Sequence, residues 1–324
     1  MILLLDADKE AVHYCFKDNN QTLEQGTLRE IGLLKERLCR FNKDHKIKIV
    51  GYRVQNGGSV IDRPVMELTT SLAAHIGETP CLGPNSDMSI KELFNFCSER
   101  FKSSRHFILC DSAFFLNMPE YARAYAIPFE YTEEGLLRYG RHGIVHQWAL
   151  KRLAAVKGAK SGKIMTVFLN DGGADVVAIK EGRPMMTSQG FSDFDGIMSQ
   201  TGCGSIDTSI IFQLFFAGHS SDNIYQMLSQ ESGFKALSGD SEAALASDIF
   251  SYQLIKTIGA GIAVLEGIDS IVFIGDDQKK IRDWTSHFLR QVKFPGNFLV
   301  ETHYFGFDKW SLFSQLLAEC ARDG

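Results

Sequence analysis

The chain has 324 residues, of which 44% are hydrophobic, and it carries a formal net charge of −5 with an isoelectric point near 6.0. A chain of this length and apolar content can bury a sizeable core and is expected to form two domains rather than one. Acidic and basic residues are spread along the whole sequence, which argues against a broad nucleic-acid footprint.

The cysteines and the apolar segments bear on the compartment. The seven cysteines are an odd number without C-x-x-C spacing, which argues against a disulfide framework or zinc knuckle and for a reducing compartment. Residues 1–5 are apolar, but Asp6 and Asp8 follow at once, so we expect no signal peptide. No apolar run approaches the roughly 20 residues of a membrane span. We therefore expect a soluble cytoplasmic protein with no nucleic-acid or membrane partner.

The first half of the chain alternates short apolar runs with helical patterns. Residues 1–6 and 12–16 predict two strands that form a hairpin. Residues 31–41 have apolar positions at helical spacing, and residues 46–54 alternate as a strand does. The turn signal Asn56-Gly57-Gly58 follows this strand. Helices are expected over 65–76 and 90–101, and a buried strand over 106–110 ends in Asp111.

The second half repeats the beginning of the first. A helix is expected over 146–156, a small basic linker over 156–162, and two strands over 164–169 and 174–179 around a turn at 170–173. Each half thus starts with a strand, a polar turn containing aspartate and a second strand, which predicts a duplicated α/β domain. The remaining expected elements are helices over 210–216, 221–228 and 243–266, a strand over 271–274, a strand over 298–300 and a helix over 310–321.

Residues 138–146 (Arg-Tyr-Gly-Arg-His-Gly-Ile-Val-His) hold two histidines four positions apart, just before an amphipathic run. His142 stands between Arg141 and a glycine at the mouth of the expected helix. A basic side chain beside a titratable imidazole in this position can hold an anionic transition state. His146 lies one helical turn further along, where a structural role is favoured.

Eight stretches, in order over nearly the whole chain, resemble motifs of the acetate kinase family, which includes butyrate and propionate kinases. Residues 138–146 resemble R-Y-G-F-H-G-x-S-H, with Arg141 in place of phenylalanine. The other stretches are 52–58 (H-R-V-V-H-G-G), 111–119 (D-T-A-F-H-x-x-M-P), 128–131 (P-Y-E-Y), 187–191 (T-S-M-G-F), 201–207 (T-R-x-G-D-I-D), 232–239 (S-G-L-L-G-L-S-G) and 250–273, which is similar to the helix and strand before G-I-G-E-N.

The resemblance implies an α/β fold of two ribonuclease-H-like (actin-like ATPase) domains flanking a central cleft, as in the acetate and sugar kinase, heat-shock-70 and actin superfamily. We expect domain I over residues 1–138, with the C-terminal tail 302–324 packing back on it, and domain II over residues 139–301. The family also implies a homodimer, here expected through domain II.

The resemblance further implies the roles of individual residues in transferring a phosphoryl group from ATP to a short-chain carboxylate. His142, Asp111 and Arg53 match the catalytic positions, and Arg53, Asn56 and Arg141 are expected to bind the substrate. Asp111 is also the expected ligand or orienting group for Mg²⁺, which with ATP is the cofactor set that an active member would use. Arginine suits such a site because it stays charged and binds oxygens in a fork.

The nucleotide side departs from the family pattern. Asp6 and Asp8 lie where the family has a small polar phosphate loop, and His13 occupies its lysine position. Carboxylates near a triphosphate are repelled unless a metal intervenes. The family's second catalytic arginine is Gly202 here. The expected phosphate- and nucleotide-binding residues are Asp6, Asp8, Asp171, Gly172, Gly173 and Gly275.

These patterns leave three functions open. The first is an acetate-kinase-like phosphotransferase that acts on a short-chain carboxylate, with altered nucleotide handling. The second is a catalytically impaired homologue that binds a small anion or a protein partner. The third, which the motifs fit less well, is another enzyme of the superfamily that acts on a carbamoyl or sugar substrate.

Overall fold

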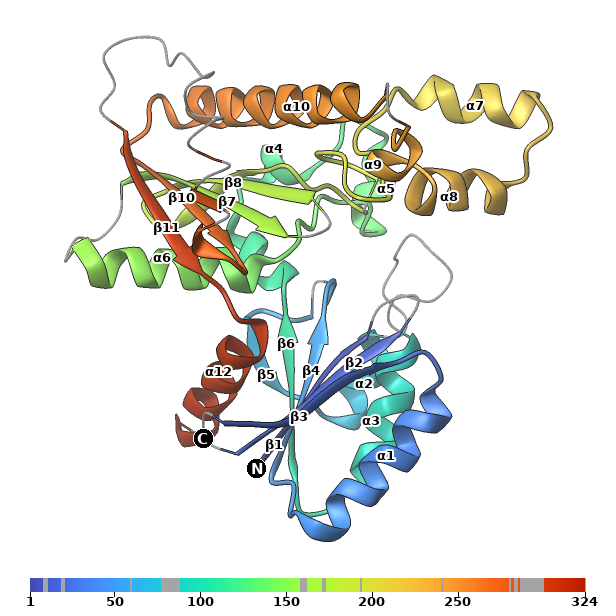
Figure 1. The fold of residues 1–324 in the computed structure, drawn as a ribbon, viewed down its shortest axis with the longest axis vertical. Helices are drawn as coiled ribbons and strands as arrows, with labels where there is room; N and C mark the ends of the chain where they lie inside the picture. The colour runs from blue at the N-terminus through green and yellow to red at the C-terminus, as the bar shows by residue number, and fades with distance from the viewer. Residues whose placement is uncertain are drawn as a thin grey trace.

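The computed structural model describes residues 1–7, 11–18, 21–58, 60–76, 88–157, 162–170, 173–192, 194–239, 242–279, 281–282, 285 and 300–323. The elements are arranged around two β-sheets, one in each half of the molecule in Figure 1. The N-terminal segment starts the lower sheet of that view, and the C-terminal helix returns to lie beside it.

The first sheet has the strand order β3-β2-β1-β4-β6-β5. Its strand β1 pairs antiparallel with β2 and parallel with β4, and β4 pairs parallel with β6. Every residue of β1 is buried because both faces of this strand are covered, which explains its unbroken apolar run. The strands are β1 (Ile2–Ala7), β2 (Val12–Asp18), β3 (Gln21–Leu28), β4 (Ile49–Val54), β5 (Val65–Glu67) and β6 (Arg105–Cys110), and the helices of this part are α1 (Ile31–Asp44), α2 (Thr70–Ile76) and α3 (Met88–Arg100).

The second sheet repeats the topology of the first. Its strand order is β11-β10-β7-β8-β9. The pairs β7–β8 and β8–β9 are antiparallel, and the pairs β7–β10 and β10–β11 are parallel. Read from the other edge, this is the arrangement of β3-β2-β1-β4-β6, so the duplicated α/β domain is confirmed. The strands are β7 (Lys163–Asn170), β8 (Gly173–Lys180), β9 (Arg183–Thr187), β10 (Ser270–Gly275) and β11 (Glu301–Gly306).

The remaining helices cover the second sheet or connect the two halves. Helix α10 (Glu242–Leu265) lies along one face of the second sheet, and α6 (Gly143–Lys157) lies on the face toward the first half (Figure 1). The expected helices near α6, α7, α8, α10 and α12 are confirmed to within a few residues. The other bounds are η1 (Ser112–Asn117), α4 (Glu120–Arg123), α5 (Phe129–Glu133), α7 (Thr208–Phe216), α8 (Ser221–Gln230), α9 (Gly233–Ala236) and α12 (Lys309–Asp323).

Three apolar clusters form the core. One lies between the first sheet and helices α1 to α3, and another lies between the second sheet and α10. The third contains residues of both sheets together with α6 and α12, so it joins the two halves. Leu4 of β1, Phe168 of β7 and Leu317 of α12 all belong to this shared cluster. Burial of a common apolar surface therefore fixes how the two sheets lie toward each other.

Three strands escape the sequence patterns. β3 is an edge strand with mostly exposed or half-buried side chains, so it lacks the apolar alternation that would predict it. The helix expected over 65–76 is wrong in its first part, because residues 65–67 pair with β6 as β5. β9 was not expected either, and it follows the turn at Glu181 as the edge of the second sheet. The strand expected over 298–300 is β11, which starts three residues later, at Glu301. Residues 298 and 299 lie outside the described residues.

Two sets of contacts bear on the expected domain limits. Residues 301–306 pair with β10, so the tail expected to pack on the first half is divided, and of its ordered elements α12 contacts the first sheet. The limit expected after residue 138 falls within a segment that bonds to the second half. The Tyr125 hydroxyl accepts a hydrogen bond from the Phe191 backbone, and Arg138 pairs with Asp195 at 2.8 Å. The exact division into domains stays a prediction.

The shared cluster gives a test of how α12 is held. Leu317 is fully buried, and its side chain fills the space beside Gly51 of β4. We expect Leu317→Ala to lower the free energy of unfolding by about 2–5 kcal/mol, as other buried leucine truncations do. Urea unfolding followed by circular dichroism measures this, with the exposed Gln315→Ala on the same helix as control. Equal midpoints for the two variants would contradict the packing of α12 on the sheet.

Candidate active site

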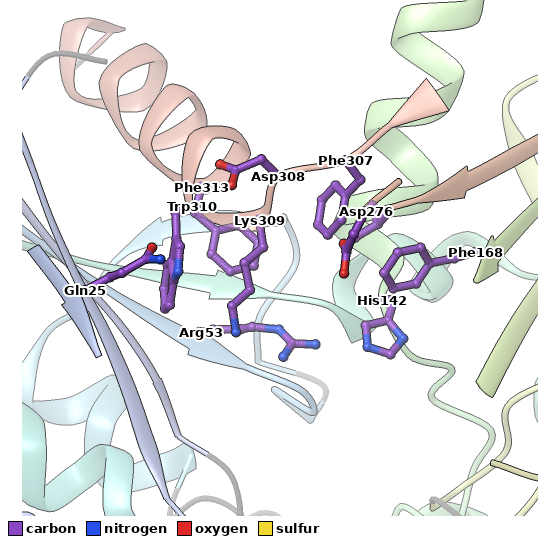
Figure 2. Close-up of a pocket in the computed structure, with 11 residues that line it drawn as sticks. Gln25, Arg53, His142, Phe168, Asp276, Phe307, Asp308, Lys309, Trp310 and Phe313 are labelled. Carbon is purple, nitrogen blue, oxygen red and sulfur yellow. The ribbon is translucent and has the colours of Figure 1, made fainter. Parts of the chain in front are cut away.

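A cavity of about 560 Å³ lies where the carboxyl ends of strands from both sheets face each other. In open α/β sheets, ligands bind at this edge. Figure 2 shows Arg53 and Lys309 on one side of the cavity and His142, Phe168 and Asp276 on the other. The lining residues are Gln25, Arg53, His142, Val145, Phe168, Asp276, Phe307, Asp308, Lys309, Trp310 and Phe313.

Arg53 is the centre of a charge network at the end of β4. The strand register places it directly beside Asp6 of β1, and Asp111 follows the neighbouring strand β6. Its Nε and Nη2 donate to Asp111 Oδ2 at 3.0 and 2.6 Å, and its Nη1 donates to Asp6 Oδ1 at 3.1 Å. Lys309 Nζ donates to Asp6 Oδ2 at 2.9 Å. Two cations and two carboxylates are therefore interleaved.

The buried charges in this network hold each other ionised. Burial alone would raise the pKa of Asp6, but the charges of Arg53 and Lys309 outweigh it and lower the pKa well below its usual range. Burial opposes the charged form of Arg53 too, yet Asp111 and Asp6 raise its pKa. Removing one member of such a buried pair typically costs about 3–5 kcal/mol, because the other charge is left uncompensated.

Asp111 also ties the start of α6 to the first sheet. Its backbone N–H donates to Val54 O at 3.0 Å, and its Oδ1 accepts a longer hydrogen bond of 3.5 Å from the Ile144 backbone. A side chain at Gly143 would overlap the Asp111 carbonyl oxygen, so only glycine allows this close approach. The glycine after His142 is thus required for packing, and it brings the histidine close to Asp111.

His142 is held by groups from the second sheet. Its φ of 52° lies in the left-handed region, which non-glycine residues rarely adopt and which often marks functional sites. Its Nδ1 pairs with Asp175 Oδ2, and Asp175 Oδ1 accepts a hydrogen bond from Gln189 at 2.6 Å. Phe168 packs edge-on at 5.0 Å between ring centroids. A carboxylate on Nδ1 orients the imidazole so that Nε2 is the nitrogen that acts on a ligand.

The environment of Asp175 and His146 sets two further protonation states. Burial would raise the pKa of Asp175, but His142 and then Arg141 counter this and lower the pKa to about 2. Burial lowers the pKa of His146 to about 3, so this ring is neutral at physiological pH. Its Nδ1 lies 2.7 Å from Thr166 Oγ1 inside the core. The contact agrees with the structural role expected for His146.

The structure brings together only some of the predicted site residues. Arg53 and His142 line the cavity, and the buried Asp111 and Asp6 are paired with Arg53. Asn56 and Arg141 are half-buried and do not line it, and the Asn56 side chain accepts a hydrogen bond from the Gly58 backbone at 3.0 Å. Their roles in substrate binding stay predictions.

The nucleotide-side residues are only partly described. Asp8, Asp171 and Gly172 lie outside the described residues. Gly173 starts β8 with a φ of 154°, and Gly275 ends β10 immediately before the cavity residue Asp276. Binding of phosphates or nucleotide by these positions stays a prediction.

Four site residues were missed by sequence reasoning. Asp175 could have been found from the hairpin, because a turn at 170–173 pairs it with Phe168. Gln189 lies in the stretch 187–191 but was given no role. Lys309 and Trp310 start α12, and no local pattern connects them to Asp6.

The fit of a divalent cation can be tested against the donors present. Among the residues that the structure describes, no three His, Cys, Asp or Glu side chains are grouped so as to hold a metal ion. The expected ligand Asp111 is paired with Arg53, and the neighbouring Asp6 is paired with both Arg53 and Lys309. Mg²⁺ needs anionic or neutral oxygens in an octahedral shell, and both oxygens of Asp6 and Oδ2 of Asp111 already accept from cations. Asp6 and Asp111 therefore do not fit the expected Mg²⁺ site.

The two-sheet architecture is the actin-like ATPase fold, and comparison with solved structures supports this. A propionate kinase from Francisella tularensis aligns with a TM-score of 0.83 and 21% identity, over 98% of this chain and 99% of that one. The acetate kinase of Porphyromonas gingivalis aligns with a TM-score of 0.80 and 21% identity, over 99% of both chains. The expected fold class is confirmed.

The sequence comparisons define the family. The profile described as the acetokinase family matches residues 6–297, and the chain belongs to this family. It is 31% identical to an acetate kinase of Acaryochloris marina over 71% of this chain and 61% of the relative. It is 30% identical to an acetate kinase of Clostridium botulinum over 85% of this chain and 73% of the relative. The match thus spans about three fifths of the length of the first of these relatives.

The buried imidazole of His146 predicts a pH dependence. Its ordinary pKa of about 6.5 applies to the unfolded chain, whereas the folded pKa is about 3. Between these values only the unfolded state binds the proton, so stability is lost as the pH falls below about 6.5. We expect the free energy of unfolding of the wild type to fall by an amount on the order of 3 kcal/mol between pH 6.5 and pH 4 because of this imidazole. His146→Gln should lack this fall.

Chemical denaturation at several pH values measures this slope. His219→Gln, at an exposed position, is the matched control and should keep the wild-type slope. Parallel curves for His146→Gln and the wild type would show that the imidazole is not held neutral in the fold.

Proposed function

We propose that the protein is a carboxylate phosphotransferase of the acetokinase family with altered nucleotide handling. It would convert a short-chain carboxylate and ATP into an acyl phosphate and ADP. The observation that carries this proposal is that the oriented His142–Asp175 pair and the Arg53–Asp111 pair border one cavity, at the edge where both sheets end. Family membership supports the reaction class.

The reaction needs alignment and charge compensation more than covalent chemistry. A carboxylate oxygen forms a bond to the γ-phosphorus while the bond from that phosphorus to the bridging oxygen breaks, and ADP leaves with the electron pair. His142, which Asp175 orients through Nδ1, would donate a hydrogen bond from Nε2 to the transferring group. The Nη2 of Arg53 retains one N–H beyond its bond to Asp111, and this N–H would orient the carboxylate.

A second candidate function is a catalytically impaired homologue that binds a small anion or a protein partner. It is supported by the pairing of Arg53 with two buried carboxylates and by Asp6 and Gly202 at positions where the family has a polar loop and an arginine. Calorimetry separates the two functions. Absence of nucleotide binding favours the second, whereas tight binding of magnesium–ATP counts strongly against it.

The cytoplasm is the proposed location. The six cysteines in the described part of the chain are free thiols, which agrees with a reducing compartment. By length and composition α10 could cross a membrane, but its buried residues recur at helical spacing and pack on β8 and β9. This packing supports a helix of a globular protein, because helices of soluble proteins can be as long and apolar as a membrane span.

The outer apolar surface of the second half supports the proposed homodimer. None of the nine residues of α7, all of which the structure describes, is buried. Phe212 and Phe216 of this helix are 61% and 85% exposed, and Tyr252 of α10 is 66% exposed. Exposed apolar patches of this kind mark interaction surfaces. A second copy would cover them, in agreement with the dimer that the family resemblance implies.

Activity is tested by trapping the acyl phosphate as its hydroxamate, with a panel of short carboxylates and with ATP or pyrophosphate as donor. We expect turnover by the wild type and a roughly 10²–10³-fold lower kcat in His142→Asn, because one donor to the transferring group is lost. Asparagine suits the comparison because it tolerates a positive φ. His219→Asn is the control. No turnover with any substrate pair would contradict the proposed function.

The dimer is tested by light scattering after size exclusion. We expect Phe212→Glu combined with Phe216→Glu to convert a dimer into a monomer, because charges on a buried apolar contact are costly. Phe129→Glu changes an exposed phenylalanine of α5 and should leave the dimer intact. A monomeric wild type at micromolar concentration, or its binding to liposomes through this face, would contradict the proposal.

A further inference from the structure

Lys309 is placed to act as a fixed cation of the cavity. It is the first residue of α12, and its Nζ lies 2.9 Å from Asp6 Oδ2 and 4.6 Å from the centroid of the Trp310 ring. Its side chain lines the cavity and is about a third exposed, so the ammonium meets both the buried carboxylate and the open space. Figure 2 shows its end close to the Arg53 guanidinium.

The carboxylate oxygens of Asp6 and Asp111 all accept hydrogen bonds. Asp6 Oδ1 accepts from Arg53, and its Oδ2 accepts from both Arg53 and Lys309. Asp111 Oδ2 accepts twice from Arg53, and its Oδ1 accepts from the Ile144 backbone. A divalent cation would have to displace these donors and approach two fixed positive charges. At such short range Coulomb repulsion opposes this strongly.

The same cluster can still bind an anion. An ammonium group carries three donors, and Asp6 uses one of those of Lys309. Arg53 retains one N–H on Nη2. Asp308 lines the same cavity and adds negative charge, so a ligand with one phosphoryl group is favoured over a polyphosphate.

We propose that Lys309 supplies internally the positive charge that a divalent cation would otherwise bring, and that the cavity binds a small phosphate-bearing anion without magnesium. This inference rests on the proposed function for the class of ligand, which is the acyl phosphate of that reaction. The charge replacement itself stands on the contacts of Lys309, Arg53 and the two carboxylates.

Binding to the wild type is measured first, by calorimetry with acetyl phosphate and with inorganic phosphate. We expect the same Kd, within about twofold, in EDTA and in millimolar Mg²⁺. Lys309→Met, a neutral side chain of similar length, should weaken binding at least tenfold. Lys309→Arg should largely retain it. Lys102→Met, an exposed lysine at the opposite edge of the sheet, should have no effect.

Metal binding is measured separately, with Mn²⁺ and electron paramagnetic resonance. We expect no Mn²⁺ binding to wild-type protein that depends on Asp6. Lys309→Met should gain a Mn²⁺ site by freeing Asp6 Oδ2, and adding Asp6→Asn should remove that site.

Three results would overturn the inference. They are phosphate binding that requires Mg²⁺, no phosphate binding in either buffer, and Mn²⁺ binding to the wild type that Asp6→Asn abolishes. Failure of the proposed function would look different from failure of this inference. In that case no hydroxamate would form, but phosphate would still bind in EDTA.

Discussion

The guanidinium of Arg53 is buried between Asp6 and Asp111, and the geometry of the candidate site depends on this one arrangement. It aligns the ends of β1, β4 and β6, and through Asp111 it reaches the first turn of α6, where His142 lies. Because an unpaired charge at this depth would be costly, the three side chains hold one another in place. Lys309 extends the network to α12, so the last helix of the chain is part of the site.

The duplicated sheets explain where the cavity lies. Each half has the same strand directions, and the two are joined by an apolar cluster that includes α6 and α12. Both helices enter this shared core with their first residues beside the cavity. The apolar contacts fix the separation of the halves, and polar groups from each half can then face a ligand between them. This division between packing and chemistry is how one fold carries many activities.

The chain retains the fold of its family but has a distinctive distribution of charge. The His142–Asp175 pair and Arg53 provide donors suited to a phosphoryl or carboxylate group. Asp308 places negative charge where a polyphosphate would meet it, and Lys309 compensates the buried Asp6 from within the protein. Metal-independent anion binding and altered nucleotide handling both follow from this distribution as proposals.

The sequence by itself determined the order of the main elements, the duplication and the family. Periodicity and turn signals depend on neighbouring residues, and motifs such as 138–146 are contiguous, so both can be read from the chain alone. It did not reveal β3, β5 or β9, which exist because an adjacent strand offers hydrogen bonds at the sheet edge. Only the tertiary structure decided that Lys309 pairs with Asp6, about 300 residues away. Such a contact is set by the packing of α12 on the first sheet, and no local pattern encodes it.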